Sequence, residues 1–493
     1  RRPSFPPRTL RFARRKPATT GLLLALSVLV ATTGWLLWVR SRELADFRRI
    51  ADLEIARDLI DARPSLFPLG PERVDRMNAW LSRAEELFGR ESRHAVTLSA
   101  LPEPGRDSWK KEDDSGSRWM RAQLEDLLDV FASLHEEYDR LRPKVILAER
   151  LREVTIEEAR GEWARVADRV ASDERFRGWT PSPQLGLLPL GPDPRSGLEE
   201  FAHVLSGAPP ARDPQSGVLK IDEESSVVLV LVPHGRTRVG CSRPGENLPH
   251  PDPERQTWDG PPCEVRLDPY LISKYEFTQA QWRRHTGSRV SYYATPDRYV
   301  PDSAGLHPAE HMEQGEALVL ASELGLRLPT ESQWEHAARA GTATPWSFGD
   351  DRSKMGRFAN IADHTAFTLQ PSAGWQFEPE IDDGHLCHAP IGSLSPNPWG
   401  LHDMHGNVQE WTASSWEDWS EHPPRDGIGE TARNYEHITI RGGSFSLNAT
   451  GARSSLRVGS PPHVRHGTVG FRLSMQMDGV SAPDGESVGK EGD

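Results

Sequence analysis

The stretch "NPWGLHDMHGNVQEW", residues 397–411, is polar, irregular and closed by a tryptophan. Its apolar residues follow neither the two-residue period of a strand nor the three- and four-residue spacing of a helix. Once such a segment is taken from water, each of its backbone N–H and C=O groups needs a hydrogen-bond partner. We therefore expect bound cations, together with Trp411 buried behind the segment, to hold it in one shape.

The sequence before this stretch predicts a few regular elements. Residues 225–233, "SSVVLVLVP", are β-branched and apolar, which indicates a strand. One helix is predicted to end near Gly325, and the next to begin at Thr330, because Thr330 and Gln333 have the spacing of a capping box. Helical periodicity largely disappears beyond Gly341, so we expect long loops between short strands.

Three further motifs accompany the opening stretch: "RLPTESQWEHAARAG" (327–341), "IRGGSF" (440–445) and "GFRL" (470–473). In this order the four motifs resemble the formylglycine-generating enzyme, or sulfatase-modifying factor, family. The resemblance runs from about Val227 to Gln476, roughly half of the chain. It implies an α+β, C-type-lectin-like fold with little regular secondary structure and with calcium held in loops.

The resemblance places a calcium loop within the opening stretch. Asp403 and Glu410 would supply carboxylates, and Gly406 and Val408 would supply backbone carbonyls. Calcium prefers six to eight oxygen ligands of these kinds. The alternative is that these polar side chains cap turns and hold no ion.

A second calcium site of the family resembles the segments "NIAD" and "DDGH". Its ligands would be Asn360, the carbonyl of Ile361, Asp383 and the carbonyl of His385. The spacing between the two segments differs here from the spacing in the family. We therefore expect calcium as the cofactor at these two places, with the second match the less close.

Catalytic members of the family oxidise a cysteine with the help of copper(I) bound by two cysteines. Alignment backward from Gly470 places Ala449 and Ser454 at those two positions, and no cysteine occurs from His388 to Asp493. Alanine has no ligand atom, and copper(I) prefers thiolates to hydroxyl groups. The sequence therefore predicts neither copper nor a catalytic residue for this oxidation.

Other enzyme chemistry finds little support in the sequence. Residues 41–176 lack the H-x3-H-x-E pattern of the iron-dependent sulfoxide synthases, and no GxSxG nucleophile elbow is present. Histidines do gather in the C-terminal half, and we interpret them as scattered surface residues, with a metal site as the alternative. These are His385, His388, His402, His405, His463 and His466.

Charge and cysteine content limit the partners further. The net charge of −13 and the isoelectric point near 5.8 give no electrostatic signal for nucleic acid. Cys241, Cys263 and Cys387 form no CxxC pair, which disfavours zinc. They are either three small buried thiols or include a disulfide between Cys241 and Cys263.

Residues 21–39, "GLLLALSVLVATTGWLLWV", are uncharged and mostly apolar. At about 1.5 Å per residue, such a run is just long enough to cross a bilayer core. Basic residues precede it, so the positive-inside rule predicts a single-pass membrane protein with its N-terminus in the cytoplasm and all residues after Arg40 extracytoplasmic. A cleaved signal peptide and a buried soluble helix are the alternatives.

These observations predict six segments. In chain order they are a basic juxtamembrane segment (1–17), a transmembrane helix (18–40), a helical stalk (41–176), a Pro/Gly-rich linker (177–224), the sulfatase-modifying-factor domain (225–476) and a disordered tail (477–493).

The function that follows is a membrane-anchored module that lacks the catalytic cysteines and senses a ligand or binds a protein. Its partners would be a membrane and an unidentified protein, peptide or small molecule. The sequence starts without Met, so it is either processed or a fragment, and we expect a fragment. "RFARRKP" is similar to the juxtamembrane end of bacterial Ser/Thr kinases, and if that similarity holds, a kinase domain preceded Arg1. The alternatives are an oxidoreductase of the same family with altered chemistry and a structural scaffold of the cell envelope.

Overall fold

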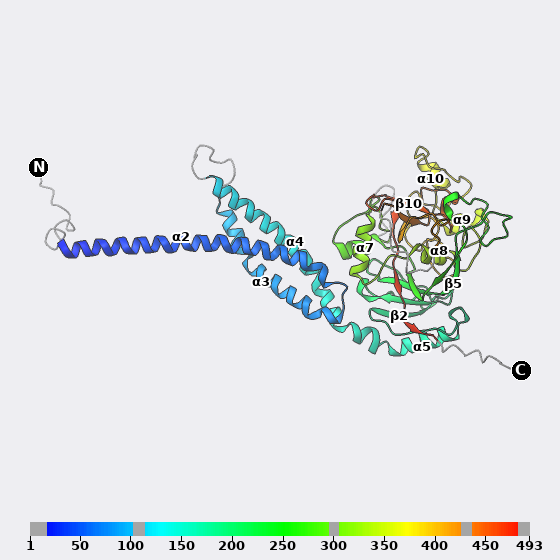
Figure 1. Ribbon diagram of the computed structural model, residues 1–493, viewed down its shortest axis with the longest axis horizontal. Coiled ribbons are helices and arrows are strands. Elements are labelled where there is room, and N and C mark those ends of the chain that lie inside the picture. The colour runs from blue at the N-terminus through cyan, green and yellow to red at the C-terminus, as the bar shows by residue number, and fades with distance from the viewer. Residues whose placement is uncertain (1–16, 102–113, 295–304, 425–435, 482–493) are drawn as a thin grey trace. The chain divides into compact units, whose positions relative to one another are not determined.

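The computed structural model describes residues 17–101, 114–294, 305–424 and 436–481. The basic segment expected at 1–17 and the tail expected at 477–493 therefore lie largely outside the described residues. The chain divides into two compact units: Arg1–Ser65 with Arg76–Asp139, and Leu66–Asp75 with Arg140–Asp493. Figure 1 shows the helices of the first unit and the mixed architecture of the second.

The first unit is built from long helices, as expected for this region. They are α2 (Pro17–Ala62), α3 (Val74–Ser99) and α4 (Asp114–Arg152). Leu59 of α2 and Trp80 of α3 are buried, and Trp80 donates its indole N–H to the Leu59 carbonyl at 2.8 Å. Asp52 of α2 accepts from Arg90 and contacts His94, which ties α2 to α3 by charge as well as by packing.

The apolar run that predicted a transmembrane helix forms the first part of α2. This helix is 46 residues long and continues past the run through charged residues to Ala62. Several of its described apolar side chains, such as Leu37 and Trp38, are exposed. In the stretches that the structure describes, no helix has both the length and the apolarity that crossing a membrane requires. The spanning helix expected at residues 18–40 is therefore not supported.

The second unit contains a five-stranded antiparallel sheet. Its strands, in spatial order, are β12 (Ser474–Gln476), β7 (Tyr270–Ser273), β4 (Val227–Val232), β3 (Glu199–His203) and β2 (Leu187–Pro192). Every residue of β4 is buried, because a continuous Val/Leu run can face apolar neighbours on both sides of a sheet. The strand predicted from residues 225–233 is confirmed as this central strand.

Residues 177–224, expected as a linker, differ from that expectation because they contribute β2 and β3 to the sheet. Phe201 of β3 is fully buried, and its ring lies 5.3 Å from that of Trp163 in α5 (Arg160–Ser172). The proline and glycine residues in this segment shape a bulged hairpin, with a register shift between Pro189 and Gly191. Composition alone indicated turns correctly but did not show that strands lie between them.

Shorter elements complete the unit. A four-stranded sheet has the order β10 (Val458–Ser460), β9 (Ile438–Arg441), β8 (Gln409–Ser415) and β11 (Val469–Gly470), with β5 (Gly235–Val239) and β6 (Cys263–Leu267) forming a separate hairpin. The helices are α6 (Gln279–Thr286), α7 (Gln314–Glu323), α8 (Glu331–Arg339), α9 (Met355–Phe358) and α10 (His364–Leu369). The fold is thus mixed helix and sheet, as predicted.

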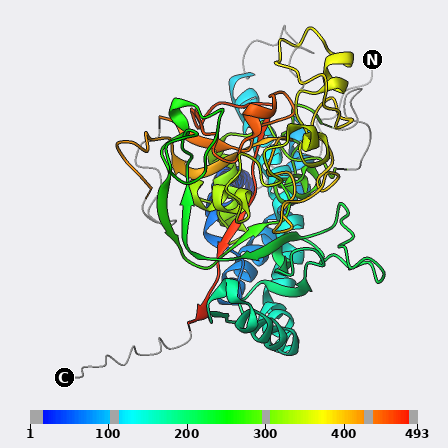
Figure 2. The same cartoon turned by 90° about the vertical axis from the view of Figure 1, so that its right-hand side faces the viewer.

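The helix α8 occupies the centre of this unit (Figure 1) and is buried along its whole length. The predicted capping box is confirmed: Gln333 N donates to Thr330 Oγ1 at 3.2 Å, and Thr330 N donates to Gln333 Oε1 at 3.0 Å. Trp334 is fully buried in the main core together with Trp411. The loops between α8 and β8, yellow in Figure 2, have few regular elements and gather on one side of this core.

Candidate functional site

The opening stretch of the sequence analysis ends in a buried ion pair. Glu410, the second residue of β8, accepts from Arg472 Nε at 2.7 Å and from Arg472 Nη2 at 2.7 Å, and both side chains are fully buried. Trp334 Nε1 also donates to Glu410 at 2.7 Å. Both oxygens of this predicted calcium ligand are therefore already engaged.

Asp403, the other predicted carboxylate, has one engaged oxygen and one free of hydrogen bonds. Its Oδ2 accepts from Gly392 N at 3.0 Å, while its Oδ1 is buried without a hydrogen-bond partner among the described residues. Glu276, which the sequence analysis missed, is also buried here and accepts from Val408 N and from the Asn407 side chain. Nothing in its local sequence marks Glu276, because its partners lie more than 130 residues away.

Three buried carboxylates, those of Glu276, Asp403 and Glu410, thus share one guanidinium, that of Arg472. Burial raises the pKa of Asp403 to about 6. Burial and the nearby charges of Asp403 and Glu410 raise the pKa of Glu276 well above its ordinary value. An excess of buried negative charge is disfavoured unless the groups bind protons or a further cation.

The second predicted loop holds its carboxylate in a similar way. Asp383 accepts from Ile361 N at 2.8 Å and from His385 N at 2.9 Å, and its own N–H donates to Asp363 Oδ2 at 2.6 Å. Burial and the charge of Asp363 raise the pKa of Asp383 to about 8. Asn360 donates its side-chain N–H groups elsewhere, which leaves its Oδ1 buried with no partner in the described chain.

The two loops are in direct contact. Asn407 N donates to the Asn360 carbonyl at 2.8 Å, and Asn360 forms an isolated parallel bridge with Gly406. Gly406 has a φ of +80°, and a Cβ there would lie 2.1 Å from the Asn360 carbonyl oxygen. Only glycine fits this position, and the structure therefore brings residues of both predicted sites together.

The donor set fits calcium at both loops, though not equally. Each loop contains a buried, unpartnered side-chain oxygen, Asn360 Oδ1 in one and Asp403 Oδ1 in the other. Amide, carboxylate and carbonyl oxygens are the ligands that calcium binds. The loop of Asn360 and Asp383 fits better, because no arginine of the described residues engages its carboxylate, whereas Arg472 engages both oxygens of Glu410.

The positions that would carry the catalytic cysteines are buried and hold no thiol. Ala449 and Ser454 are both fully buried. Trp346 Nε1 donates to the Ala449 carbonyl at 3.2 Å, and Ser454 N donates to the Pro345 carbonyl at 2.8 Å. The segment is thus hydrogen-bonded to the loop that follows α8.

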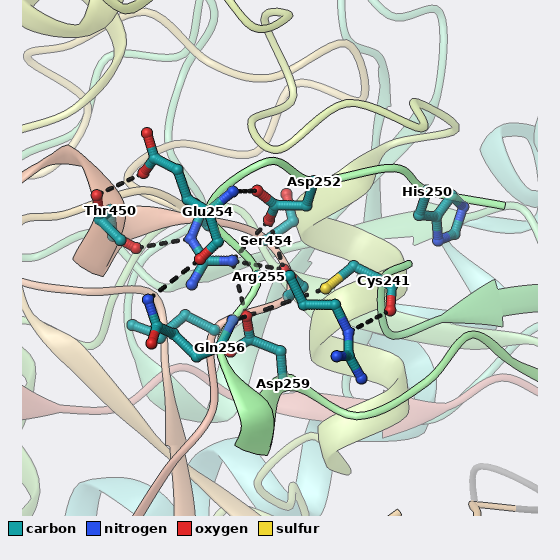
Figure 3. A network of polar contacts seen from close by, with 12 residues as sticks. Cys241, His250, Asp252, Glu254, Arg255, Gln256, Asp259, Thr450 and Ser454 are labelled. Carbon is teal, nitrogen blue, oxygen red and sulfur yellow. Dashed lines mark hydrogen bonds and ion pairs between the residues drawn. The ribbon is translucent and has the colours of Figure 1, made fainter. Parts of the chain in front are cut away.

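A network of polar contacts fixes this segment from a second side (Figure 3). The side chains of Cys241, Asp252 and Asp259 form the one group of three metal-type ligands found among the described residues. Arg453 Nη1, however, donates to Asp252 at 2.6 Å and to Asp259 at 2.8 Å. The Arg453 guanidinium therefore already neutralises the carboxylates of Asp252 and Asp259, in the place where a metal ion would otherwise do so.

The chemistry of Cys241 agrees with a structural role for this network. Burial, as the largest cause, raises the pKa of Cys241 to about 12, which keeps the thiol protonated at neutral pH. All three cysteines are free thiols, so the disulfide considered between Cys241 and Cys263 is not formed, and Cys263 is only partly buried. The network was not predictable from the sequence, because Arg453 lies about 200 residues from its partners.

A cavity of about 730 Å³ is lined mainly by residues of the loops that follow α8. Phe348 and Phe358 form one aromatic wall, with ring centroids 4.7 Å apart and planes 12° from parallel. The Arg357 guanidinium lies 5.5 Å from the Phe358 ring centre. Three basic and two acidic side chains line the cavity, namely Arg195, Lys354, Arg357, Glu380 and Asp382.

The histidines expected at the surface include buried ones. His405 is 2% exposed; Ser347 N donates to its Nε2 at 3.0 Å, and its Nδ1 contacts the Ala452 carbonyl at 2.8 Å. Burial lowers the pKa of His405 to about 4 and that of His402 to about 3. These two neutral rings hold loops in place, while His463 is exposed as expected.

Comparison with known proteins agrees with this architecture. Residues 215–477 match the profile of a family described as "Sulfatase-modifying factor enzyme 1-like domain". A "Formylglycine-generating enzyme" of Streptomyces coelicolor is 33% identical over 221 residues, which cover 42% of this chain and 62% of that protein. The "Inactive C-alpha-formylglycine-generating enzyme 2" of Bos taurus is 29% identical over 192 residues, covering 36% of this chain and 52% of that one.

Among solved structures, the one titled "Structure of PvdO from Pseudomonas aeruginosa" is similar with 26% sequence identity and a TM-score of 0.41. The match covers 50% of this chain and 94% of that chain. The matches to the two formylglycine-generating-enzyme relatives, by contrast, cover less than two thirds of the length of each of those proteins.

Proposed function

Because the chain belongs, through residues 215–477, to the sulfatase-modifying factor enzyme 1-like domain family, we propose that this domain binds a ligand or a partner and does not oxidise cysteine. The observation that carries the proposal is the composition of residues 388–493, which contain no cysteine. Without a thiolate pair there is no soft ligand set for copper(I). One relative is itself described as inactive.

The packing around the expected catalytic positions supports the same proposal. Ala449 and Ser454 are fully buried, and Arg453 between them is held by Asp252 and Asp259. A segment fixed by a buried ion-paired guanidinium resists rearrangement, because breaking such a pair costs about 3–5 kcal/mol. The segment therefore serves as a rigid wall of the domain.

We assign ligand recognition to the cavity of about 730 Å³. Its volume lies in the range of small-molecule sites, roughly 300–1,000 Å³. The stacked rings of Phe348 and Phe358 offer apolar surface, and Arg195, Lys354 and Arg357 offer positive charge. These features suit a peptide or small molecule that carries a carboxylate next to an aromatic or aliphatic group.

The experiment for the absence of oxidation uses the full chain. Titration with copper(I) and incubation with a cysteine-containing sulfatase peptide should give no tight copper binding and no aldehyde product. A positive aldehyde assay, with the matching mass change of the peptide, would overturn the proposal. An active formylglycine-generating enzyme assayed in parallel shows that the conditions support the reaction.

The experiment for binding uses a library of peptides with acidic and aromatic residues. The charge reversal Arg357→Glu should abolish capture of the peptides that the parent chain selects. Arg465→Glu serves as the control, because Arg465 is exposed like Arg357 but does not line the cavity. Equal capture by the parent and by R357E would exclude this cavity as the recognition site.

Calcium is proposed as the structural ion of the loops, held by Asn360 and Asp383 with the carbonyls of Ile361 and His385. Asp403, with the carbonyls of Gly406 and Val408, would form the second site, where Glu410 is shared with Arg472. The ion would neutralise buried carboxylates and fix the C-type-lectin-like loops beside the cavity.

The sensor role and the extracytoplasmic location are proposed from the sequence alone. Their support is the cluster of basic residues before the apolar run of residues 21–39, and the similarity of "RFARRKP" to the juxtamembrane end of bacterial Ser/Thr kinases. Protease treatment of intact cells should degrade the C-terminal domain if it lies outside the cytoplasm. Protection of the domain would contradict this location and, with it, the sensor role.

A further inference from the structure

Two buried histidines from distant parts of the chain face each other in the C-terminal unit. His307 lies before α7, and His388 lies before the opening stretch; they are 3% and 2% exposed. Their Nδ1 atoms are 2.9 Å apart, and their ring centroids are 4.9 Å apart. Neither side chain lines the cavity or supplies a ligand to the proposed calcium loops.

We propose that His307 and His388 form a binding site for a divalent transition-metal ion of the class that imidazole nitrogen prefers, such as zinc or cobalt. Two nitrogens 2.9 Å apart can both reach one ion at the roughly 2.0–2.1 Å of zinc–imidazole bonds. Imidazole suits this class of metals, whereas carboxylates and carbonyls suit calcium. The site therefore differs in chemistry from the oxygen-rich loops.

Both imidazole rings are in the neutral form, which is the protonation state that binds a metal ion. Burial lowers the pKa of His307 to about 3 and that of His388 to about 4. Both imidazoles are therefore neutral at pH 7, and each offers a lone pair without first losing a proton.

Glu310 lies on the outer side of the His388 ring, where a metal-bound histidine usually has a carboxylate partner, and its contact with the ring is an ion-pair distance rather than a hydrogen bond. Its carboxylate is fully buried, and its Oε1 lies 3.8 Å from His388 Nε2. The backbone N–H groups of Tyr292 and Tyr293 donate to this carboxylate and fix its position. Metal-binding histidines typically donate their second ring N–H to such a carboxylate, which sets the tautomer. Glu310 is thus a positioning residue.

A simple hydrogen bond between the two rings is the alternative to a bound ion. Such a bond uses one N–H and one lone pair of the facing nitrogens. The outer Nε2 atoms of His307 and His388 are both buried, and neither has a hydrogen-bond partner in the described part of the chain. A bound ion uses both facing lone pairs and places the protons of both rings on Nε2, whereas a hydrogen bond keeps one proton between the facing nitrogens.

The surroundings limit access of water to the pair. The rings of Tyr293 and Phe445 lie 5.8 Å and 6.0 Å from the His388 ring, both edge-on. An ion bound here would be surrounded largely by aromatic side chains. Water would therefore compete only weakly with the two histidine nitrogens for the ion.

The test is titration of the full chain with Co²⁺ in excess Ca²⁺, so that the oxygen-rich loops are occupied before cobalt is added. Visible absorption should report one nitrogen-ligated cobalt per chain, and Zn²⁺ should displace it. His307→Ala and His388→Ala should each lose this signal. Glu310→Gln should retain it with an affinity lower by about 10–100-fold.

His402→Gln is the matched control, because His402 is a histidine of the same unit whose Nδ1 contacts the Leu394 carbonyl at 2.9 Å. It should bind cobalt like the parent chain. His388→Gln provides a second readout: Zn²⁺ should raise the melting temperature of the parent but not that of H388Q. Absence of cobalt binding by the parent at about 1 mM, or unchanged binding in the His307 and His388 variants, would overturn the proposal.

Discussion

Arg472 and Glu410 form a two-pronged ion pair at the centre of the C-terminal unit, with both side chains fully buried and two N–O distances of 2.7 Å. Arg472 also donates to the carbonyls of Ser273 and His402. One guanidinium therefore connects β7, the proposed calcium loop and the last part of the domain.

We expect Arg472→Met to destabilise the folded state by about 3–5 kcal/mol, because it leaves the buried carboxylate of Glu410 without its cation. Urea unfolding followed by tryptophan fluorescence measures this change. Arg465→Met is the control: Arg465 pairs with Glu316 at 2.9 Å on the surface, and its loss should change the free energy of unfolding by less than about 1 kcal/mol. Similar effects of the two substitutions would contradict the structural role of Arg472.

Removal of calcium should lower the melting temperature. An ion present at about 100 times its dissociation constant stabilises the folded state by about 2.7 kcal/mol, which corresponds to roughly 3–5 °C in a domain of this size. Scanning calorimetry with a chelator and with added calcium measures the difference. An unchanged melting temperature would contradict the proposal that calcium binds these loops.

Substitutions identify the loop responsible for that shift. Asp383→Asn should abolish much of the calcium effect, because Asp383 lies in the better-fitting loop. Asp382→Asn is the neighbouring control, since Asp382 is exposed and its carboxylate accepts from Thr365 and Gly384 N. Equal calcium effects in the two variants would place the ion elsewhere.

The pH dependence of stability should carry a contribution from His402. Burial lowers its folded-state pKa from 6.5 to about 3, so the unfolded chain binds a proton that the folded chain does not. The contribution is present above about pH 6.5 and is lost as the pH falls toward 3. Between pH 6 and pH 4, His402→Gln should therefore flatten the dependence of unfolding free energy on pH by about 1.4 kcal/mol per pH unit.

Urea titrations at a series of pH values measure this slope. Exposed His463 provides the control, and His463→Gln should leave the slope of the parent chain unchanged. The comparison between variants isolates one proton, whatever the other buried groups contribute. A slope for H402Q equal to that of the parent would show that His402 binds its proton in the folded state as well.

The segment before the family match should be required for folding. Lys274 is buried and donates to Asp193 at 2.9 Å and to Glu200 at 2.6 Å, and both acids precede residue 215. A chain that starts at residue 215 leaves this ammonium group unpaired and uncovers one edge of β4. We expect it to lack a cooperative thermal transition, whereas a chain that starts at Arg140 should melt cooperatively.

Short-range sequence signals predicted the local elements well. The capping box of Thr330 and Gln333 and the strand at 225–233 depend on neighbours in sequence, and both are present in the structure. The loop-rich character beyond Gly341 was likewise visible in the absence of periodicity. The expectation of a linker at 177–224 differs from the structure, because the turn-forming residues there do not show whether strands lie between them.

The contacts between buried polar side chains could not be predicted from the sequence, for a physical reason. Contacts such as Arg453 with Asp252, or His307 with His388, join residues 201 and 81 positions apart. Periodicity and motif spacing report the local environment, while burial and pKa depend on what the fold places opposite each side chain. The surface interpretation of His405 failed for the same reason.

The pairing of β1 (Thr180–Pro181) with β13 (Gly479–Val480) brings the first and last strands of the C-terminal unit together. The stretch of chain between these two strands therefore begins and ends at neighbouring points, and the pairing fastens the end of the domain to the segment that leads into it.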